Sequence, residues 1–202
     1  MPTSRLEAFS DGVLAIIITI MVLELQVPEG HDLASLFSST GSSLLTYLLS
    51  FVYVGIYWTN HHHMLQVTDR ITGGTLWANL HLLFWLSLFP FTTAWMDESD
   101  LARIPVVVYG LNLLAAAIAY FIMQTIIVHA QGPDSALKQA LGKDAKGKLS
   151  PVLYLLGVGC ALAAAEHTMF WIYIGIGFFV AVAILWLIPD RRIERRVSPK
   201  GA

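Results

Sequence analysis

Charged residues are scarce in this chain. Asp, Glu, Lys and Arg make up only 13 % of its 202 residues, whereas 56 % are hydrophobic, and the mean hydropathy is +0.65. A soluble domain carries about 25 % charged residues. This deficit, together with recurring apolar runs of about 20 residues, predicts an integral membrane protein.

Several other features are rare or missing, and each excludes a kind of structure or partner. The single cysteine, Cys160, excludes an intrachain disulfide. The net charge of −2 gives no basic excess for a nucleic-acid partner. The longest polar connection, residues 130–148, is too short to be a soluble domain, and no internal repeat is evident. We therefore expect an all-α membrane protein without a soluble domain.

The apolar runs predict six transmembrane helices. Backbone groups inside a bilayer must be hydrogen-bonded within the protein, which favours helices for continuous apolar runs. Some runs exceed the length needed to cross and are expected to tilt or to project into water. Together the spans form one transmembrane domain over residues 1–202, and we place them at about 6–26, 38–64, 73–96, 101–129, 149–166 and 168–189.

The basic residues predict the orientation of these spans. With six crossings, both termini lie on one side of the membrane. That side carries 11 of the 12 lysines and arginines, and only Arg103 falls on the other. Because short cytoplasmic segments are enriched in Lys and Arg, we expect a multi-pass protein of the cell membrane with both termini in the cytoplasm.

The first span has an uneven distribution of side chains. At about 100° per residue, Ile16, Ile20 and Leu23 fall within about 40° of one another, and Thr19 lies about 60° to one side of Ile16. Asp11 points about 140° away from this stripe. The stripe is compatible with ordinary packing inside a helix bundle. A hydrophobic constriction around a pore axis is the other interpretation, and the pattern alone does not choose.

Besides this pattern, the first half of the chain contains motifs that resemble those of a known family. In order, they are Arg5-x-x-x-Phe9-Ser10-Asp11, Tyr57-Trp58-x-x-His61-His62, and Asn79 followed by Leu88-Phe89-Pro90-Phe91. They resemble the signature of the endosomal and lysosomal potassium channel family and its prokaryotic relatives. Beyond about residue 100 the likeness rests on helix count and general character.

This resemblance implies a function and an assembly. Animal members resemble two fused six-helix repeats that dimerise, so a single repeat implies a prokaryotic-type homotetramer whose first helices line the pore. The family's pore isoleucine corresponds to Ile16 and its selectivity-associated threonine to Thr19, with Ile20 and Leu23 as further hydrophobic positions. A serine that animal members place before the isoleucine is Ala15 here, which predicts weaker selectivity for potassium over sodium.

The remaining polar side chains are expected to form a structural network. Consecutive histidines on a helix point about 100° apart, so His61, His62 and His63 are poorly placed to share one metal ion. Buried polar groups need hydrogen-bond partners, and the cytoplasmic ends of the first three spans lie at similar depths. The expected members of this network are Arg5, Ser10, Asp11, Trp58, His61, His62 and Asn79.

Taken together, these observations predict a potassium-preferring cation channel with passive conduction, which is not an enzyme. We expect no metal or cofactor, and only potassium ions and lipid besides the other subunits. The main alternative is a secondary transporter or proton-coupled cation exchanger that uses Asp11 and the histidines. A membrane enzyme using the histidine run with Asp69 or Glu166 lacks a paired metal-ligand spacing.

Overall fold

The computed structural model describes residues 2–132, 135–141, 144–165 and 169–187. Within these ranges all regular secondary structure is helical. The helices are α1 (Thr3–Leu23), α2 (Leu33–Gln66), α3 (Gly73–Ser87), α4 (Phe89–Glu98), α5 (Arg103–Gln131), α6 (Ala136–Leu141), α7 (Ala145–Ala163) and α8 (Met169–Leu187). The all-α prediction is therefore confirmed for the described part of the chain.

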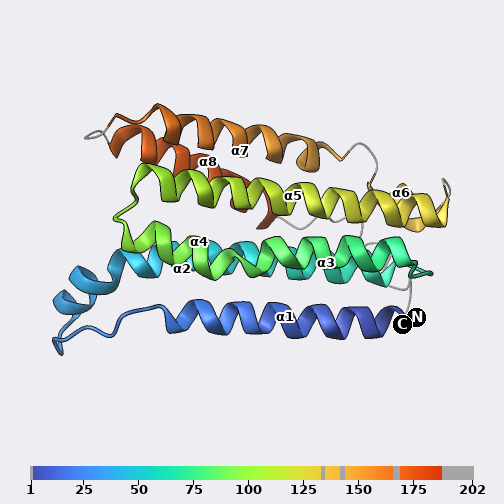
Figure 1. Cartoon of the computed structure of the whole chain (residues 1–202), viewed down its shortest axis with the longest axis horizontal. Coiled ribbons are helices and arrows are strands. Elements are labelled where there is room, and N and C mark those ends of the chain that lie inside the picture. The colour runs from blue at the N-terminus through green and yellow to red at the C-terminus, as the bar shows by residue number, and fades with distance from the viewer. Residues whose placement is uncertain (1, 133–134, 142–143, 166–168, 188–202) are drawn as a thin grey trace, which may run out of the picture.

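The long helices lie side by side along one axis (Figure 1). The first helix, α1, forms one side of the bundle, and α5, α7 and α8 form the other, with α2, α3 and α4 between them. Side chains of α1 are buried at intervals of three or four residues, which is the spacing of one helix face. These residues are Leu6, Ser10, Leu14, Ile17 and Met21.

The predicted third span, 73–96, is two helices rather than one. The chain turns at Leu88, whose backbone N–H donates to the Trp85 carbonyl oxygen at 3.3 Å. Pro90 follows at the start of α4. Proline has no N–H, and inside a helix its ring meets the carbonyl group four residues earlier. An unbroken helix would need a backbone N–H at residue 90 to donate to a carbonyl group in the preceding turn, and proline cannot supply it. The helix therefore breaks just before Pro90, and α3 and α4 follow one another end to end (Figure 1).

The connection predicted as a loop at 130–148 also contains helix. The fourth predicted span, 101–129, continues to Gln131 and ends at Gly132, whose φ of 90° favours glycine. The short helix α6 then occupies residues 136–141. The predicted boundary between the last two spans, Glu166 to Thr168, lies outside the described residues.

Close helix packing in the second half follows from two glycines. A Cβ atom on Gly175 would lie 2.7 Å from the Gly157 carbonyl oxygen, and one on Gly157 would lie 2.5 Å from the Phe179 ring. Small residues let helix backbones approach in this way. Gly159 and Gly177, which belong to the same small-residue stretches, have open space around them, so only part of this composition serves the contact between α7 and α8.

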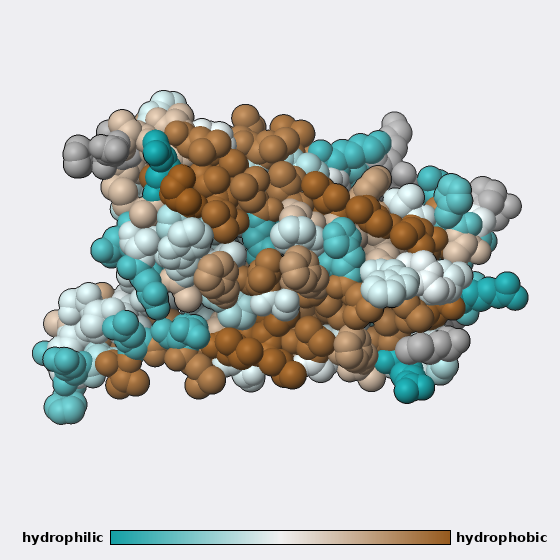
Figure 2. Space-filling view, in the orientation of Figure 1, coloured by the Kyte–Doolittle hydropathy of each residue, from teal (hydrophilic) through white to brown (hydrophobic). Residues whose placement is uncertain are grey.

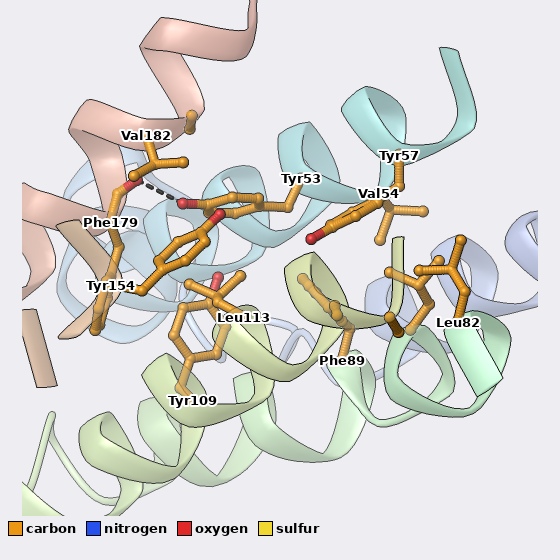
Figure 3. Packing of buried hydrophobic residues seen from close by; sticks show 14 of the residues in the cluster. Tyr53, Val54, Tyr57, Leu82, Phe89, Tyr109, Leu113, Tyr154, Phe179 and Val182 are labelled. Atoms are coloured by element: carbon orange, nitrogen blue, oxygen red, sulfur yellow. Dashed lines mark hydrogen bonds between the residues drawn. The ribbon is translucent and has the colours of Figure 1, made fainter. Parts of the chain in front are cut away.

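Aromatic side chains fill the core between α2, α4, α5, α7 and α8. Figure 3 shows Tyr53, Phe89, Tyr109, Tyr154 and Phe179 packed together. The Tyr53 hydroxyl donates to the Phe179 carbonyl oxygen at 2.6 Å, which ties α2 to α8. These five helices thus form a densely packed bundle against which α1 lies.

The surface is that of a membrane protein. Among the described helices, α1, α2, α5 and α8 are long and apolar enough to cross a bilayer. Figure 2 shows hydrophobic side chains over the middle of one face and hydrophilic ones gathered toward the ends. This distribution matches the expectation that the bundle axis crosses the hydrocarbon layer.

Candidate functional site: the two faces of the first helix

One face of α1 is not covered by the other described residues of the chain. Ile16 is 59 % exposed, Ile20 42 % and Leu23 81 %, and Thr19 is exposed beside them. The Thr19 hydroxyl donates to the Ile16 carbonyl oxygen at 2.9 Å. Its oxygen lone pairs therefore remain directed away from the helix hydrogen bonds. The stripe read from the helical period is thus a surface of the subunit. It lies beside the face that packs on α2, α3 and α4, with Ile16 about 100° around the helix from the buried Ile17.

The packed face of α1 contains a buried polar network. Asn79 of α3 donates through Nδ2 to the Ser10 hydroxyl oxygen at 3.1 Å, and this hydroxyl donates to the Leu6 carbonyl oxygen at 2.9 Å. The Asn79 Oδ1 atom lies 2.7 Å from His61 Nε2 on α2. Ser10 and Asn79 are fully buried and His61 is 2 % exposed. These contacts join α1, α2 and α3 at one point.

The tautomer of His61 follows from this arrangement. An amide oxygen only accepts hydrogen bonds, so His61 Nε2 must carry the proton that reaches Asn79. The Nδ1 atom of the same ring is buried without a hydrogen-bond partner. Because the ring is buried, its neutral form avoids the cost of removing a charge from water.

A second set of polar contacts lies closer to the surface. Trp58 donates through Nε1 to Asp11 Oδ1 at 3.0 Å, and His62 Nδ1 pairs with Glu7 Oε1. The Gln66 amide nitrogen lies 2.7 Å from the other nitrogen of His62. These contacts hold the first half of α1 against the end of α2.

Sequence reasoning missed Glu7 and Gln66. The spacing of these residues along their helices could have indicated both. Glu7 and Asp11 are four residues apart on α1. Trp58, His62 and Gln66 follow one another at the same interval on α2. Residues four apart share a helix face, so two such series on adjacent helices predict a ladder of contacts.

Arg5 does not enter either set of contacts. Its side chain is exposed and makes no hydrogen bond or ion pair with another described residue. The helical period places it about 20° from Ile16, on the uncovered face rather than the packed one. Of the seven residues expected in one network, the structure therefore connects six in two separate groups and leaves Arg5 apart.

The three consecutive histidines have three different environments. His61 faces Asn79, His62 faces Glu7, and His63 lines an open groove beside α1. Among the described residues, no group of three or more His, Cys, Asp or Glu side chains lies close enough together to hold a metal ion. The divergence of the rings follows from the rotation between successive helical residues.

This groove has a volume of about 800 Å³ and lies between α1, α2 and the end of α8. Its walls include Leu14, Ala15 and Ile18 of α1, Phe51 of α2 and Trp186 of α8. The lining is mostly apolar, and Asp11 is at its edge. A second uncovered surface thus adjoins the exposed face of α1.

Comparison with known proteins identifies the group to which this architecture belongs. The family model described as endosomal/lysosomal potassium channel TMEM175 matches residues 5–90. A potassium channel of Chryseobacterium sp. (strain P1-3) is 51 % identical over 198 residues, which cover 98 % of this chain and 99 % of the relative. This chain belongs to the TMEM175 family.

A solved structure extends this membership to the fold. It is the crystal structure of a lysosomal potassium-selective channel TMEM175 homolog from Chamaesiphon minutus. The TM-score is 0.76 at 31 % sequence identity, and the match covers 93 % of this chain and 97 % of the other. The endosomal/lysosomal proton channel TMEM175 of Homo sapiens is also similar, with 33 % identity over 112 residues, half of this chain and 22 % of the human protein.

Membership in TMEM175 assigns this protein to a family of membrane ion channels rather than enzymes. It confirms the family indicated by the motifs in the first half of the chain. The range matched by the family model contains both faces of α1 and their partners on α2 and α3.

Proposed function

We propose that this protein is a potassium-preferring cation channel that conducts passively. Four subunits, each crossing the cell membrane six times with both termini in the cytoplasm, would surround a central pore. The support is family membership together with the named functions of its relatives, which include potassium channels of Chryseobacterium and Chamaesiphon minutus.

The observation that carries this proposal is the uncovered face of α1. Four copies of that face around an axis would present Ile16, Ile20 and Leu23 as stacked aliphatic rings. The face also displays Arg5 and Thr19, which a surface turned only toward lipid does not need. The groove beside α1 supports an assembly, because an apolar groove of about 800 Å³ is large enough to receive side chains of a second subunit.

The chemistry of such a constriction favours potassium modestly. An aliphatic ring offers no ligands to a cation, so an ion must keep its water or lose it at a cost. Potassium holds its water less tightly than sodium and passes more easily. Thr19 adds one layer of oxygen lone pairs near the rings, because its hydroxyl proton is engaged by the Ile16 carbonyl oxygen. Ala15 adds none.

A transporter that uses Asp11 and the histidines is the alternative, and one observation favours it. Asp11 and His63 both line the groove, where a substrate has room. Against this, Asp11 accepts a hydrogen bond from Trp58, while His61 and His62 have partners inside the chain. Saturable flux with stoichiometric proton movement would establish the transporter, whereas single-channel current steps would establish the channel.

The decisive experiment is planar-bilayer recording with potassium on one side and sodium on the other. Ile16→Asn would wet the narrowest ring and supply an oxygen, so we expect larger currents and a potassium-to-sodium permeability ratio closer to one. The control is Val22→Asn, because Val22 is also exposed on α1 but lies about 120° from Ile16.

Two outcomes would overturn the pore assignment. One is an unchanged current in Ile16→Asn, and the other is an identical change in Val22→Asn. The assembly is tested separately by the oligomer mass in detergent, where four subunits are expected.

A further inference from the structure

A cavity of about 50 Å³ lies inside the subunit between α2, α5, α7 and α8. None of its lining residues belongs to α1, so it is separate from the proposed ion path. A water molecule needs about 10–15 Å³ of such volume, so the cavity has room for about three to five waters or a ligand of similar size.

Two buried polar side chains in its wall have no partner in the protein. The side chains of Tyr57 and Gln124 are 8 % and 7 % exposed and line the cavity, and neither makes a hydrogen bond with another described residue. Buried polar groups are nearly always hydrogen-bonded. The polar ends of these two side chains therefore face open space in the cavity, where water or a small ligand can supply their partners.

The cavity wall is negative. Asp144 is the one carboxylate among its lining residues, and no lysine, arginine or histidine lines it. Asp144 is held firmly, because its Oδ1 atom accepts the Gly147 N–H at 3.1 Å and caps α7. A Cβ atom on residue 147 would lie 2.3 Å from Asp144 Oδ2, so Gly147 is required for this position.

Three hydrogen-bond donors in the wall are already engaged. The Trp186 indole N–H donates to the Ser150 hydroxyl at 2.8 Å, and the Tyr120 hydroxyl donates to the Asn60 carbonyl oxygen at 3.2 Å. The Asn60 amide nitrogen donates to the Ile56 carbonyl oxygen. What remains for a ligand is the Asp144 carboxylate, the Gln124 amide, the Tyr57 hydroxyl and aromatic rings. Of these, the carboxylate and the rings attract a cation.

We propose that this cavity binds a small primary alkylammonium ion. Its N–H groups would donate to Asp144, to the Gln124 amide oxygen and to the Tyr57 hydroxyl. Its short alkyl chain would lie among the rings of Tyr120 and Trp186. Figure 3 shows Tyr57 beside Tyr53 on α2, facing the interior of this bundle. The proposal does not depend on where ions cross the membrane.

Titration calorimetry of the full chain in detergent tests the proposal, with n-propylammonium chloride as the probe and the uncharged 1-propanol as its isostere. We expect saturable millimolar binding of propylammonium and none of propanol. Quenching of tryptophan fluorescence by the probe should disappear in Trp186→Phe.

Matched variants of two aspartates test whether the Asp144 charge binds the probe. Asp144→Asn keeps the helix cap but removes the negative charge, and we expect binding at least about tenfold weaker, since 1.4 kcal/mol corresponds to tenfold. Asp32→Asn makes the same change at the cap of α2, at the far end of the molecule, and should leave binding unchanged. Gln124→Leu provides a second variant in the wall and should weaken binding as well.

Three results would overturn the proposal. They are equal binding of propanol, unchanged binding in both Asp144→Asn and Gln124→Leu, and the absence of saturable propylammonium binding in the unmodified protein.

Discussion

Adjacent isoleucines on α1 have opposite environments. Ile16 is 59 % exposed and Ile17 is 3 % exposed. The Ile17 face is complete within one subunit, because apolar side chains and the network of Ser10, Asn79 and His61 cover it. The Ile16 face is left uncovered by the part of the chain that the structure describes. The difference shows that one face of α1 serves the fold of the subunit and that the other must be explained by lipid, pore or a second subunit.

The largest expected effect comes from making the same substitution, isoleucine to asparagine, on each of the two faces at neighbouring positions. Ile17→Asn places an unpartnered amide in the core and removes apolar contacts, and we expect a loss of about 3–4 kcal/mol in the free energy of unfolding. Ile16→Asn should cost less than about 1 kcal/mol, because its side chain is exposed. Thermal unfolding of the purified proteins in detergent measures both. Equal losses would mean that the two faces are not distinct.

The next effect concerns the buried network. Asn79→Ala leaves Ser10 and His61 without their partner, and we expect a loss of about 2–3 kcal/mol. Asn112→Ala is the matched control, because Asn112 is equally buried but makes one longer bond, 3.4 Å to the Thr92 hydroxyl. Chemical or thermal unfolding should show the smaller loss for Asn112→Ala. A reversed order would contradict the role assigned to Asn79.

A smaller effect is expected at the edge of the packed face. Asp11→Ala removes the acceptor of the Trp58 indole N–H, a partly exposed contact, and should cost about 1 kcal/mol. We expect a lower melting temperature and a lower yield of the assembled protein, with ion preference unchanged. The double variant with Trp58→Phe should add little further loss, since both changes remove the same bond. Normal assembly with altered selectivity would show that Asp11 acts on ions instead.

The smallest effect on stability is expected at Thr19. Its hydroxyl bonds only to its own helix, so Thr19→Val should change the free energy of unfolding by no more than about 0.5 kcal/mol. Under the channel proposal the same change removes the oxygen nearest the aliphatic rings, and bi-ionic recording should show reduced selectivity or conductance. An unchanged permeability ratio together with unchanged conductance would remove Thr19 from the proposed pore.

Much of the architecture could be predicted from residue order. The apolar runs locate α1, α2, α5, α7 and α8 to within a few residues of the observed bounds. The interruption at Leu88 was not predicted, although Pro90 was visible, because a proline near the middle of an apolar run does not by itself say whether a helix bends or ends. The helix α6 was missed because six residues are too few to show a helical period.

For the candidate site, residue order was enough to indicate the family and to align Ile16, Thr19, Ile20 and Leu23, because a helix repeats at a known angle and the motifs follow one another in a known order. Three facts required the packed helices: which face of α1 is covered, that Glu7 is the partner of His62, and that Arg5 lies apart from the network. Helical phase orders the side chains around one axis. Which side of that axis is buried depends on where the neighbouring helices pack, and those contacts join residues far apart in the chain.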